Sequence, residues 1–213
     1  MNEKINLKEI EKKAYQFTFK DGIYDIAYGA LLISIAIAPI LREIIYLGYI
    51  VFLVLPAPLI IILGKKYITT PRIGIAKFNK NRVKTQKRIM LISSILIPLT
   101  ILLVILTAMG IFPGDIGTML GGYVIPVGAG LFAIILLSVI AYLINFSHFY
   151  IYGIAIGLGI PIADILHKTI GPPLDNLITF GITGIILLIF GIFTMSKFLQ
   201  QYPIPKEEIP NAS

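Results

Sequence analysis

The feature that most constrains this chain is a run of 48 residues, from Ile116 to Ala163, without a single Asp, Glu, Lys or Arg. As one α-helix the run would be about 72 Å long, more than twice the thickness of a bilayer's hydrocarbon core. The whole chain has 14% charged residues, whereas soluble domains have about 25%. Apolar surface on this scale has to face lipid. The sequence therefore predicts an all-α, polytopic membrane helix bundle.

Six apolar segments are long enough to cross a membrane. The uncharged run divides at Asn145–His148 into a fourth and a fifth span. The fifth holds Gly157, Gly159 and Pro161, so we expect it to be the shortest or the most distorted span, with a re-entrant segment as the alternative. The other four spans run from Ile23 to Leu41, Ile44 to Leu63, Ile89 to Phe112 and Asn176 to Ser196, within a membrane domain over residues 23–199.

The cations give the orientation. With six spans, the N-terminal segment, the connection 64–88 and the C-terminal tail share one side of the membrane, and they hold 16 of the 18 Lys and Arg residues. Only Arg42 and Lys168 fall on the other side. Because cytoplasmic loops carry an excess of Lys and Arg, we expect both termini on the cytoplasmic side of the cell membrane.

The flanking regions differ in character. Residues 1–22 alternate apolar with charged side chains, which suits a short amphipathic helix at the membrane surface, although an ordinary solvated helix fits equally well. In the basic loop, Ile73 and Ile75 followed by Asn79–Asn81 suit a small hairpin. The tail 200–213, rich in Pro and Glu, is expected to be disordered.

One candidate site lies where the first span begins. Asp21 and Asp25 are four residues apart and share a helix face. Capping of the helix explains them more simply, but the pair could also hold a cation or the basic loop. Arg72 lies between Pro71 and Gly74 and can bind a carboxylate or a phosphate through its planar fork. We therefore predict that Arg72 contacts Asp21, Asp25 or both, at a site for an anion or a lipid headgroup.

A second, weaker candidate is an external cluster of Asp164, His167 and Asp175 around the last loop. Asp164 and His167 are three residues apart, so they could face each other. A metal or acid–base site there is one interpretation. Polar residues that mark the outward ends of helices are the simpler one.

Other sites and partners are limited by composition. The chain has no Cys and two His residues. Thiolate chemistry is therefore excluded, His-rich metal centres are nearly excluded, and no cofactor is expected. Topology alone explains the basic loop, so no nucleic-acid partner is expected. The acids lie near the predicted span ends rather than at mid-depth, which argues against a proton-driven transporter.

Small residues predict close helix packing within the chain or in a dimer. They stand at intervals of three or four along the predicted spans: Ala30, Ser34 and Ala38; Gly117 and Gly121; Gly153 and Gly157; Gly181 and Gly184.

The stretch from Ile10 to Gly29, with Asp21-Gly22 opening the first span, and the later Pro71-Arg72-Ile73-Gly74 resemble a group of prokaryotic multi-spanning membrane proteins. That resemblance implies no activity. The paired carboxylate motif of phosphatidyl-alcohol transferases is missing. The layout is similar in outline to small permease subunits of type-2 ATP-binding-cassette exporters, which is an analogy of architecture.

Taken together, these patterns favour a non-enzymatic, small permease-like or lipid-interacting subunit. Its expected partners are anionic membrane lipids at the basic loop and a second copy of the chain or another membrane or cytoplasmic subunit. The alternatives are a lipid-modifying enzyme with a site at the cytoplasmic face, and a scaffold that docks a soluble partner.

Overall fold

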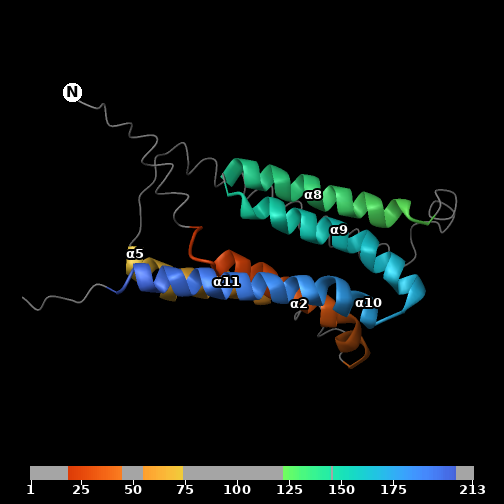
Figure 1. Cartoon of the computed structure of the whole chain (residues 1–213), viewed down its shortest axis with the longest axis horizontal. Coiled ribbons are helices and arrows are strands. Elements are labelled where there is room, and N and C mark those ends of the chain that lie inside the picture. Colours follow the sequence, from red (N-terminus) through yellow and green to blue (C-terminus); the bar gives the residue numbers. More distant parts are fainter. Residues whose placement is uncertain (1–18, 45–54, 74–121, 145, 205–213) are drawn as a thin grey trace, which may run out of the picture. The chain divides into compact units, whose positions relative to one another are not determined.

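The computed structural model describes residues 19–44, 55–73, 122–144 and 146–204 (Figure 1). These residues form helices and no strand, in agreement with the predicted all-α class. The chain divides into two compact units: Met1–Ala76 with Gly181–Ser213 (unit 1), and Lys77–Phe180 (unit 2). The predicted amphipathic helix, the third span, most of the basic loop and the end of the tail lie outside the described residues.

Four of the described helices are long and apolar enough to cross a membrane. The first span is confirmed at Ile23–Leu41, within α2 (Ile23–Ile44). The break in the uncharged run is confirmed as well, because α8 (Val124–Ile144) ends and α9 (His148–Thr169) begins on either side of it. The last candidate, Leu174–Gln201, comprises α10 (Leu174–Asn176), η2 (Leu177–Gly181) and α11 (Ile182–Gln201).

The predicted count of six spans is not confirmed. Only the end of the second predicted span is described, as the nine-residue α4 (Pro56–Gly64). The third, Ile89–Phe112, lies outside the described residues.

The fifth predicted span differs from our expectation. The helix α9 has 22 residues, one more than α8, and it runs without a break through Gly157, Gly159 and Pro161. These residues serve packing instead of interrupting the helix. A Cβ atom on Gly157 would lie 2.5 Å from the carbonyl oxygen of Gly130 on α8, and the Pro161 ring lies 3.2 Å from the Cβ position of Gly130. The glycines let the two backbones approach closely, as in other membrane helix pairs.

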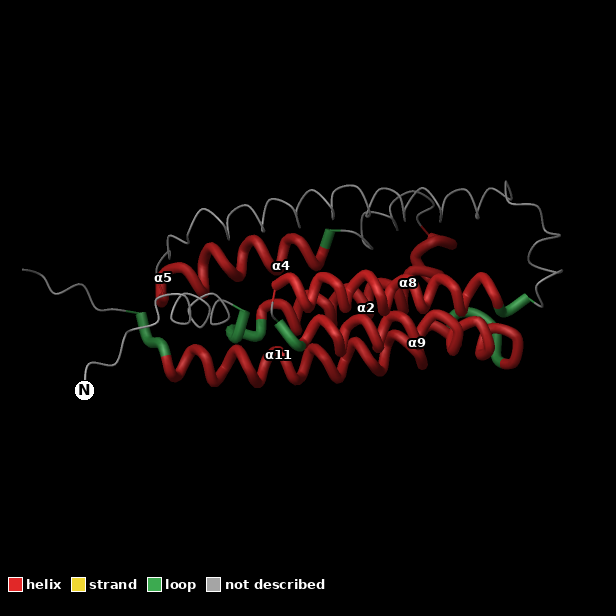
Figure 2. The backbone as a smooth tube through the Cα atoms, turned by 90° about the horizontal axis from the view of Figure 1, so that it is seen from above, coloured by secondary structure: helices red, strands yellow, loops and turns green. Residues whose placement is uncertain are grey.

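Unit 1 is built around α2, which lies between α4 and α11 (Figure 2). Along the α2–α11 contact, Gly29 faces Gly184, where an added Cβ would lie 2.9 Å from the Gly184 carbonyl oxygen. Gly22 faces Gly191 in the same way. Gly22 precedes Gly29 by seven residues, and Gly191 follows Gly184 by seven. A spacing of seven keeps residues on one face of a helix. This glycine pairing makes the helices antiparallel, so α2 begins where α11 ends.

A second helical segment completes unit 1. After α4 the chain continues without interruption through the π-helical turn η1 (Lys65–Thr69) into α5 (Thr70–Ile73). The Lys65 carbonyl oxygen accepts both the backbone N–H and the hydroxyl of Thr70, the latter at 2.8 Å. Single π-turns inside helices rotate the residues that follow and are frequent at functional sites.

In unit 2, α8 and α9 form an antiparallel pair closed by an aromatic cluster at the turn. The rings of Phe146 and Phe149 are 5.6 Å apart, and those of Phe149 and Tyr152 are 5.4 Å apart, both edge to face. All three side chains are buried. This packing fixes the α8–α9 pair, so that the beginning of α8 lies beside the end of α9.

Candidate functional site

The first candidate site begins with the turn Asp21-Gly22. Gly22 has φ +77°, a conformation that favours glycine, and an added Cβ would lie 2.8 Å from the backbone nitrogen of Met195. The backbone N–H of Ile23, the first residue of α2, donates to Asp21 Oδ1 over 3.2 Å. Asp21 therefore caps the first transmembrane helix. Its second carboxylate oxygen is left for other contacts.

That second oxygen binds the π-helical turn η1, in the middle of the α4–η1–α5 segment. Asp21 Oδ2 lies 2.5 Å from Lys65 Nζ and accepts a hydrogen bond from the Thr69 hydroxyl. The Lys65 ammonium also stands 4.9 Å from the ring centre of Tyr24 and 5.8 Å from that of Phe19. We call these five residues the Asp21 cluster. The cluster ties the predicted cytoplasmic loop to the beginning of α2.

The Asp21 cluster is largely shielded from solvent. The Asp21 side chain is fully buried, and the Lys65 side chain is 24% exposed. Burial lowers the pKa of the Lys65 ammonium, and the charge and hydrogen bond of Asp21 oppose that shift without cancelling it. A buried carboxylate of this kind needs its cation, because removing one partner of such a pair leaves an uncompensated charge.

The cation that pairs with Asp21 in the structure is Lys65. Asp21 pairs with Lys65, whereas Arg72 donates from Nη1 to the carbonyl oxygen of Ile68 over 2.8 Å, on its own helical segment. Asp25 is buried on α2, where its Cβ lies 2.9 Å from the Cβ position of Gly191 on α11. The predicted contact of Arg72 with Asp21, Asp25 or both stays a prediction.

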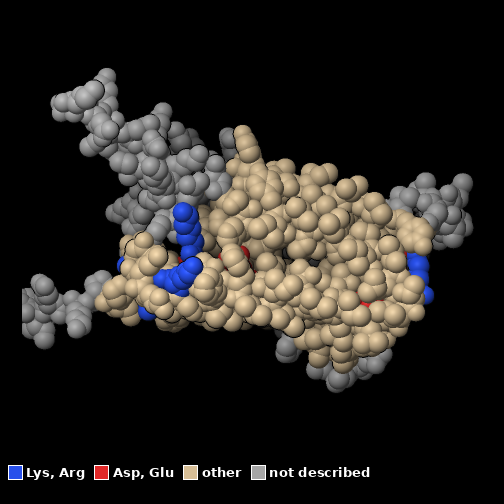
Figure 3. All heavy atoms as spheres, in the orientation of Figure 1, with Lys and Arg blue, Asp and Glu red and all other residues tan. Residues whose placement is uncertain are grey.

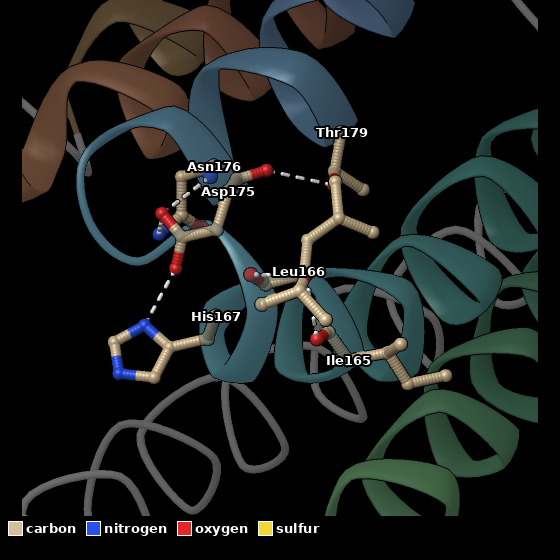
Figure 4. A network of polar contacts seen from close by, with 7 residues as sticks. Ile165, Leu166, His167, Asp175, Asn176 and Thr179 are labelled. Carbon is tan, nitrogen blue, oxygen red and sulfur yellow. Dashed lines mark hydrogen bonds and ion pairs between the residues drawn. The ribbon is translucent and has the colours of Figure 1, made fainter.

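The second candidate cluster is divided into two pairs. In the first, His167 Nδ1 lies 2.7 Å from Asp175 Oδ2, which joins the end of α9 to the short helix α10 (Figure 4). Asp175 is buried, and its Oδ1 accepts the backbone N–H of Asn176 over 2.7 Å. The Asp175 carbonyl oxygen accepts the Thr179 hydroxyl over 2.8 Å. Asp175 therefore organises the loop between α9 and α10.

In the second pair, Asp164 accepts a hydrogen bond from Lys168 over 2.8 Å, and both side chains are partly exposed. The same ammonium stands 3.9 Å from the ring centre of Tyr123, which directly precedes α8. Asp164 is thus paired with a lysine, and it is Asp175 that pairs with His167. In the part of the chain that the structure describes, no three His, Asp or Glu side chains are grouped so that they could hold a metal ion.

Several cations lie exposed or half-exposed at the end of unit 1 where α2 begins, α5 lies and α11 ends. Figure 3 shows Lys and Arg side chains gathered near α5. The Lys66 ammonium lies 5.2 Å from the ring centre of Tyr67, and that of Lys197 lies 4.4 Å from the ring centre of Phe193. We call this surface the basic face; its members are Lys20, Lys66, Arg72 and Lys197.

Lys65, Thr69 and Tyr123 are not among the site residues predicted from the sequence. Lys65 and Thr69 stand four residues apart directly after an apolar segment, the spacing that places two side chains on one helix face. The same spacing recurs along every apolar helix, whereas Pro71-Arg72 in the next turn is the more distinctive motif. Nothing in the sequence connects Tyr123 with Lys168, which are 45 positions apart.

Comparison with known proteins found no matching family model, curated protein or solved structure. The class of the protein therefore rests on its own helices. Four of them are able to span a bilayer, and the chain is a polytopic integral membrane protein.

Proposed function

We propose that this protein is a non-enzymatic, lipid-interacting subunit of the cell membrane, with its basic face on the cytoplasmic side against anionic lipid headgroups. The observation that carries the proposal is an asymmetry of charge at one end of unit 1. The cations Lys20, Lys66 and Lys197 are exposed there, whereas the acids Asp21 and Asp25 are buried. Each cation near an anionic membrane surface contributes about 1 kcal/mol of attraction.

The aromatic neighbours of these cations support the same function. Tyr67 and Phe193 are 63% and 56% exposed, and each lies beneath an ammonium group. Aromatic residues beside lysines are typical of the boundary between hydrocarbon and headgroups. We also propose that the chain is related to the group of prokaryotic membrane proteins that Asp21-Gly22 and Pro71-Arg72-Ile73-Gly74 resemble.

Burial of the carboxylates argues against the enzymatic alternative. A lipid-modifying site needs a carboxylate that substrate can reach, but Asp21 is 0% exposed and Asp25 is 1% exposed. Asp21 is also held by Lys65 and Thr69. These contacts suit a structural role at the end of the membrane domain.

A permease-like role remains a second form of the proposal. The stretches 26–41, 125–163 and 177–196 of the described spans hold no Asp, Glu, Lys or Arg. A cargo that passes along these helices would therefore be neutral or lipid-like rather than an ion or a proton.

The test is lipid mass spectrometry on the full chain extracted gently from native membrane. The variant Lys20→Gln/Lys66→Gln/Lys197→Gln should retain several-fold less anionic lipid than the unaltered protein. The charge-conserving variant Lys20→Arg/Lys66→Arg/Lys197→Arg, altered at the same three positions, is the matched control and should retain the same amount. Equal retention by the triple variant would refute the role of the basic face.

A further inference from the structure

An apolar groove on the surface of α8 is not used by the proposed function. It has a volume of about 280 Å³ and is lined by Tyr123, Val127, Gly128 and Leu131. The lining begins just before the first residue of α8 and extends about 12 Å along the helix axis. Gly128 forms its floor: an added Cβ would have no described atom within 4 Å.

The groove has a charged pair at one end. Tyr123 lines it, and the Lys168 ammonium stands 3.9 Å from the centre of the Tyr123 ring. Lys168 in turn pairs with Asp164 at 2.8 Å. The two side chains are 45% and 29% exposed, so a ligand can reach both of them. An apolar groove therefore leads away from an accessible pair of opposite charges whose net charge is zero.

The geometry points to a binding site for one zwitterionic phospholipid that carries a primary amine in its headgroup. One acyl chain lies along Val127, Gly128 and Leu131. The lipid phosphate pairs with Lys168, and the lipid ammonium pairs with Asp164. The headgroup is a dipole complementary to the protein pair, and charge-assisted hydrogen bonds of this kind are the stronger ones.

A lipid fits this site better than a second helix does. A helix that covered both the groove and the neighbouring Asp164–Lys168 pair would have to supply polar partners for that pair, because desolvating an ion pair is costly. A zwitterionic headgroup supplies both partners at once. An anionic lipid could satisfy Lys168 but would bring its charge close to Asp164. The site therefore prefers zwitterionic over anionic lipid, the reverse of the preference proposed for the basic face.

The site can be tested with the full chain in detergent, using trace phosphatidylethanolamine that carries a photoreactive group on one acyl chain. After illumination, mass spectrometry should find adducts between Tyr123 and Leu131. An added Cβ at Gly128 meets no described atom within 4 Å, so the variant Gly128→Phe can place its ring in the groove and should lose these adducts. The variant Ala129→Phe, at the neighbouring exposed position outside the groove, is the matched control and should keep them.

The headgroup is tested separately. Lys168→Gln and Asp164→Asn should each lower labelling about two- to fivefold, the range expected for a partly exposed ion pair. A phosphatidylglycerol probe with the same acyl chain should label less than the zwitterionic one. The basic-face variant Lys20→Gln/Lys66→Gln/Lys197→Gln should not change labelling by phosphatidylethanolamine, so failure of the proposed function and failure of this site can be told apart.

Three results would overturn the inference. The first is unchanged labelling in Gly128→Phe or equal loss in Ala129→Phe, which would show that the groove does not select the lipid. The second is equal or stronger labelling by the anionic probe. The third is a change of oligomeric mass in Gly128→Phe, which would identify a protein rather than a lipid as the occupant.

Discussion

Unit 1 and unit 2 each contain an Asp–Lys ion pair, in opposite surroundings. Asp21 and Lys65 lie 2.5 Å apart, with the carboxylate fully buried and the lysine mostly covered. Asp164 and Lys168 lie 2.8 Å apart on one helix, and both remain open to solvent. The first pair joins segments 44 positions apart in the sequence, whereas the second joins consecutive turns of α9.

The difference in burial indicates that the two ion pairs have different roles, one in stabilising the fold and the other in binding a ligand. A buried pair that links distant segments holds the fold together, because neither charge can be left alone inside the protein. An exposed pair within one helix adds little stability, so its charges remain available to a ligand. The Asp21 cluster thus stabilises unit 1 by joining η1 to the beginning of α2, and the Asp164–Lys168 pair is suited to contact a lipid headgroup.

The largest expected difference between the two units is the side of the membrane from which each can be labelled. Because the chain has no cysteine, single cysteines report their position without background. We expect Lys66→Cys in unit 1 to label only from the cytoplasmic side. Thr169→Cys, beside Lys168, should label only from outside, as the distribution of cations requires. A membrane-impermeant maleimide measures the outer side in intact cells and the cytoplasmic side after permeabilisation. Labelling of the two cysteines from the same side would contradict the topology.

The largest effect on stability should follow from Asp21→Ala. This change leaves the Lys65 ammonium mostly buried without its carboxylate and removes the cap of α2, so we expect a loss of about 3 kcal/mol in the free energy of unfolding. Thermal unfolding of the purified protein, followed by circular dichroism, measures it.

The matched control is Asp164→Ala, which breaks the exposed Asp–Lys pair. We expect a loss below about 1 kcal/mol. Similar losses in the two variants would show that the two ion pairs do not differ as their burial indicates.

A smaller effect tests the close helix contact of unit 2. In Gly130→Ala the added methyl group would overlap the Gly157 carbonyl group and lie 3.2 Å from the Pro161 ring. Overpacking of this kind costs about 1–3 kcal/mol. Gly128→Ala, two residues earlier on the same helix, meets no described atom within 4 Å. It should be neutral or stabilising by up to about 1 kcal/mol, because glycine is the poorer helix former. If both variants melt alike, α8 and α9 do not pack as closely as described.

The parts of the fold that could be predicted depend on features that can be found along the sequence itself, such as the length of apolar segments and the spacing of glycines. The bounds of the first span follow from where apolar residues begin and end, and the break near Asn145 follows from the limit on the length of one crossing. The close approach at Gly153 and Gly157 follows from their spacing. The first span, the break and the Gly157 contact are confirmed by α2, α8 and α9.

The partners within the candidate sites could not be predicted in the same way. Whether Lys65 or Arg72 reaches Asp21 depends on how the α4–η1–α5 segment is rotated, and the π-turn at Lys65–Thr69 sets that rotation. The contact between Tyr123 and Lys168 depends on how far α8 and α9 overlap, which neither segment specifies alone. In lipid, moreover, both faces of a helix are apolar, so hydrophobic periodicity does not tell which face is buried.

The smallest expected effect is a dependence of stability on pH that belongs to the buried pair alone. Burial lowers the pKa of the Lys65 ammonium below its ordinary value. Between the lowered pKa and the ordinary one, the unfolded chain binds more protons at this position than the folded chain does. Stability should therefore rise with pH across that window. The gain should stay below about 1 kcal/mol, because Lys65 is partly exposed and Asp21 opposes the shift.

Comparison of variants isolates this contribution. Melting temperatures measured from about pH 8 to pH 10.5 should show the rise in the unaltered protein and in Lys66→Gln, whose side chain is exposed. The rise should be absent in Lys65→Gln. Tyrosines titrate in the same range, but they are common to all three proteins, so their effect cancels in the differences. A rise that persists in Lys65→Gln would mean that another group is its source, and the buried pair would then behave like the exposed one.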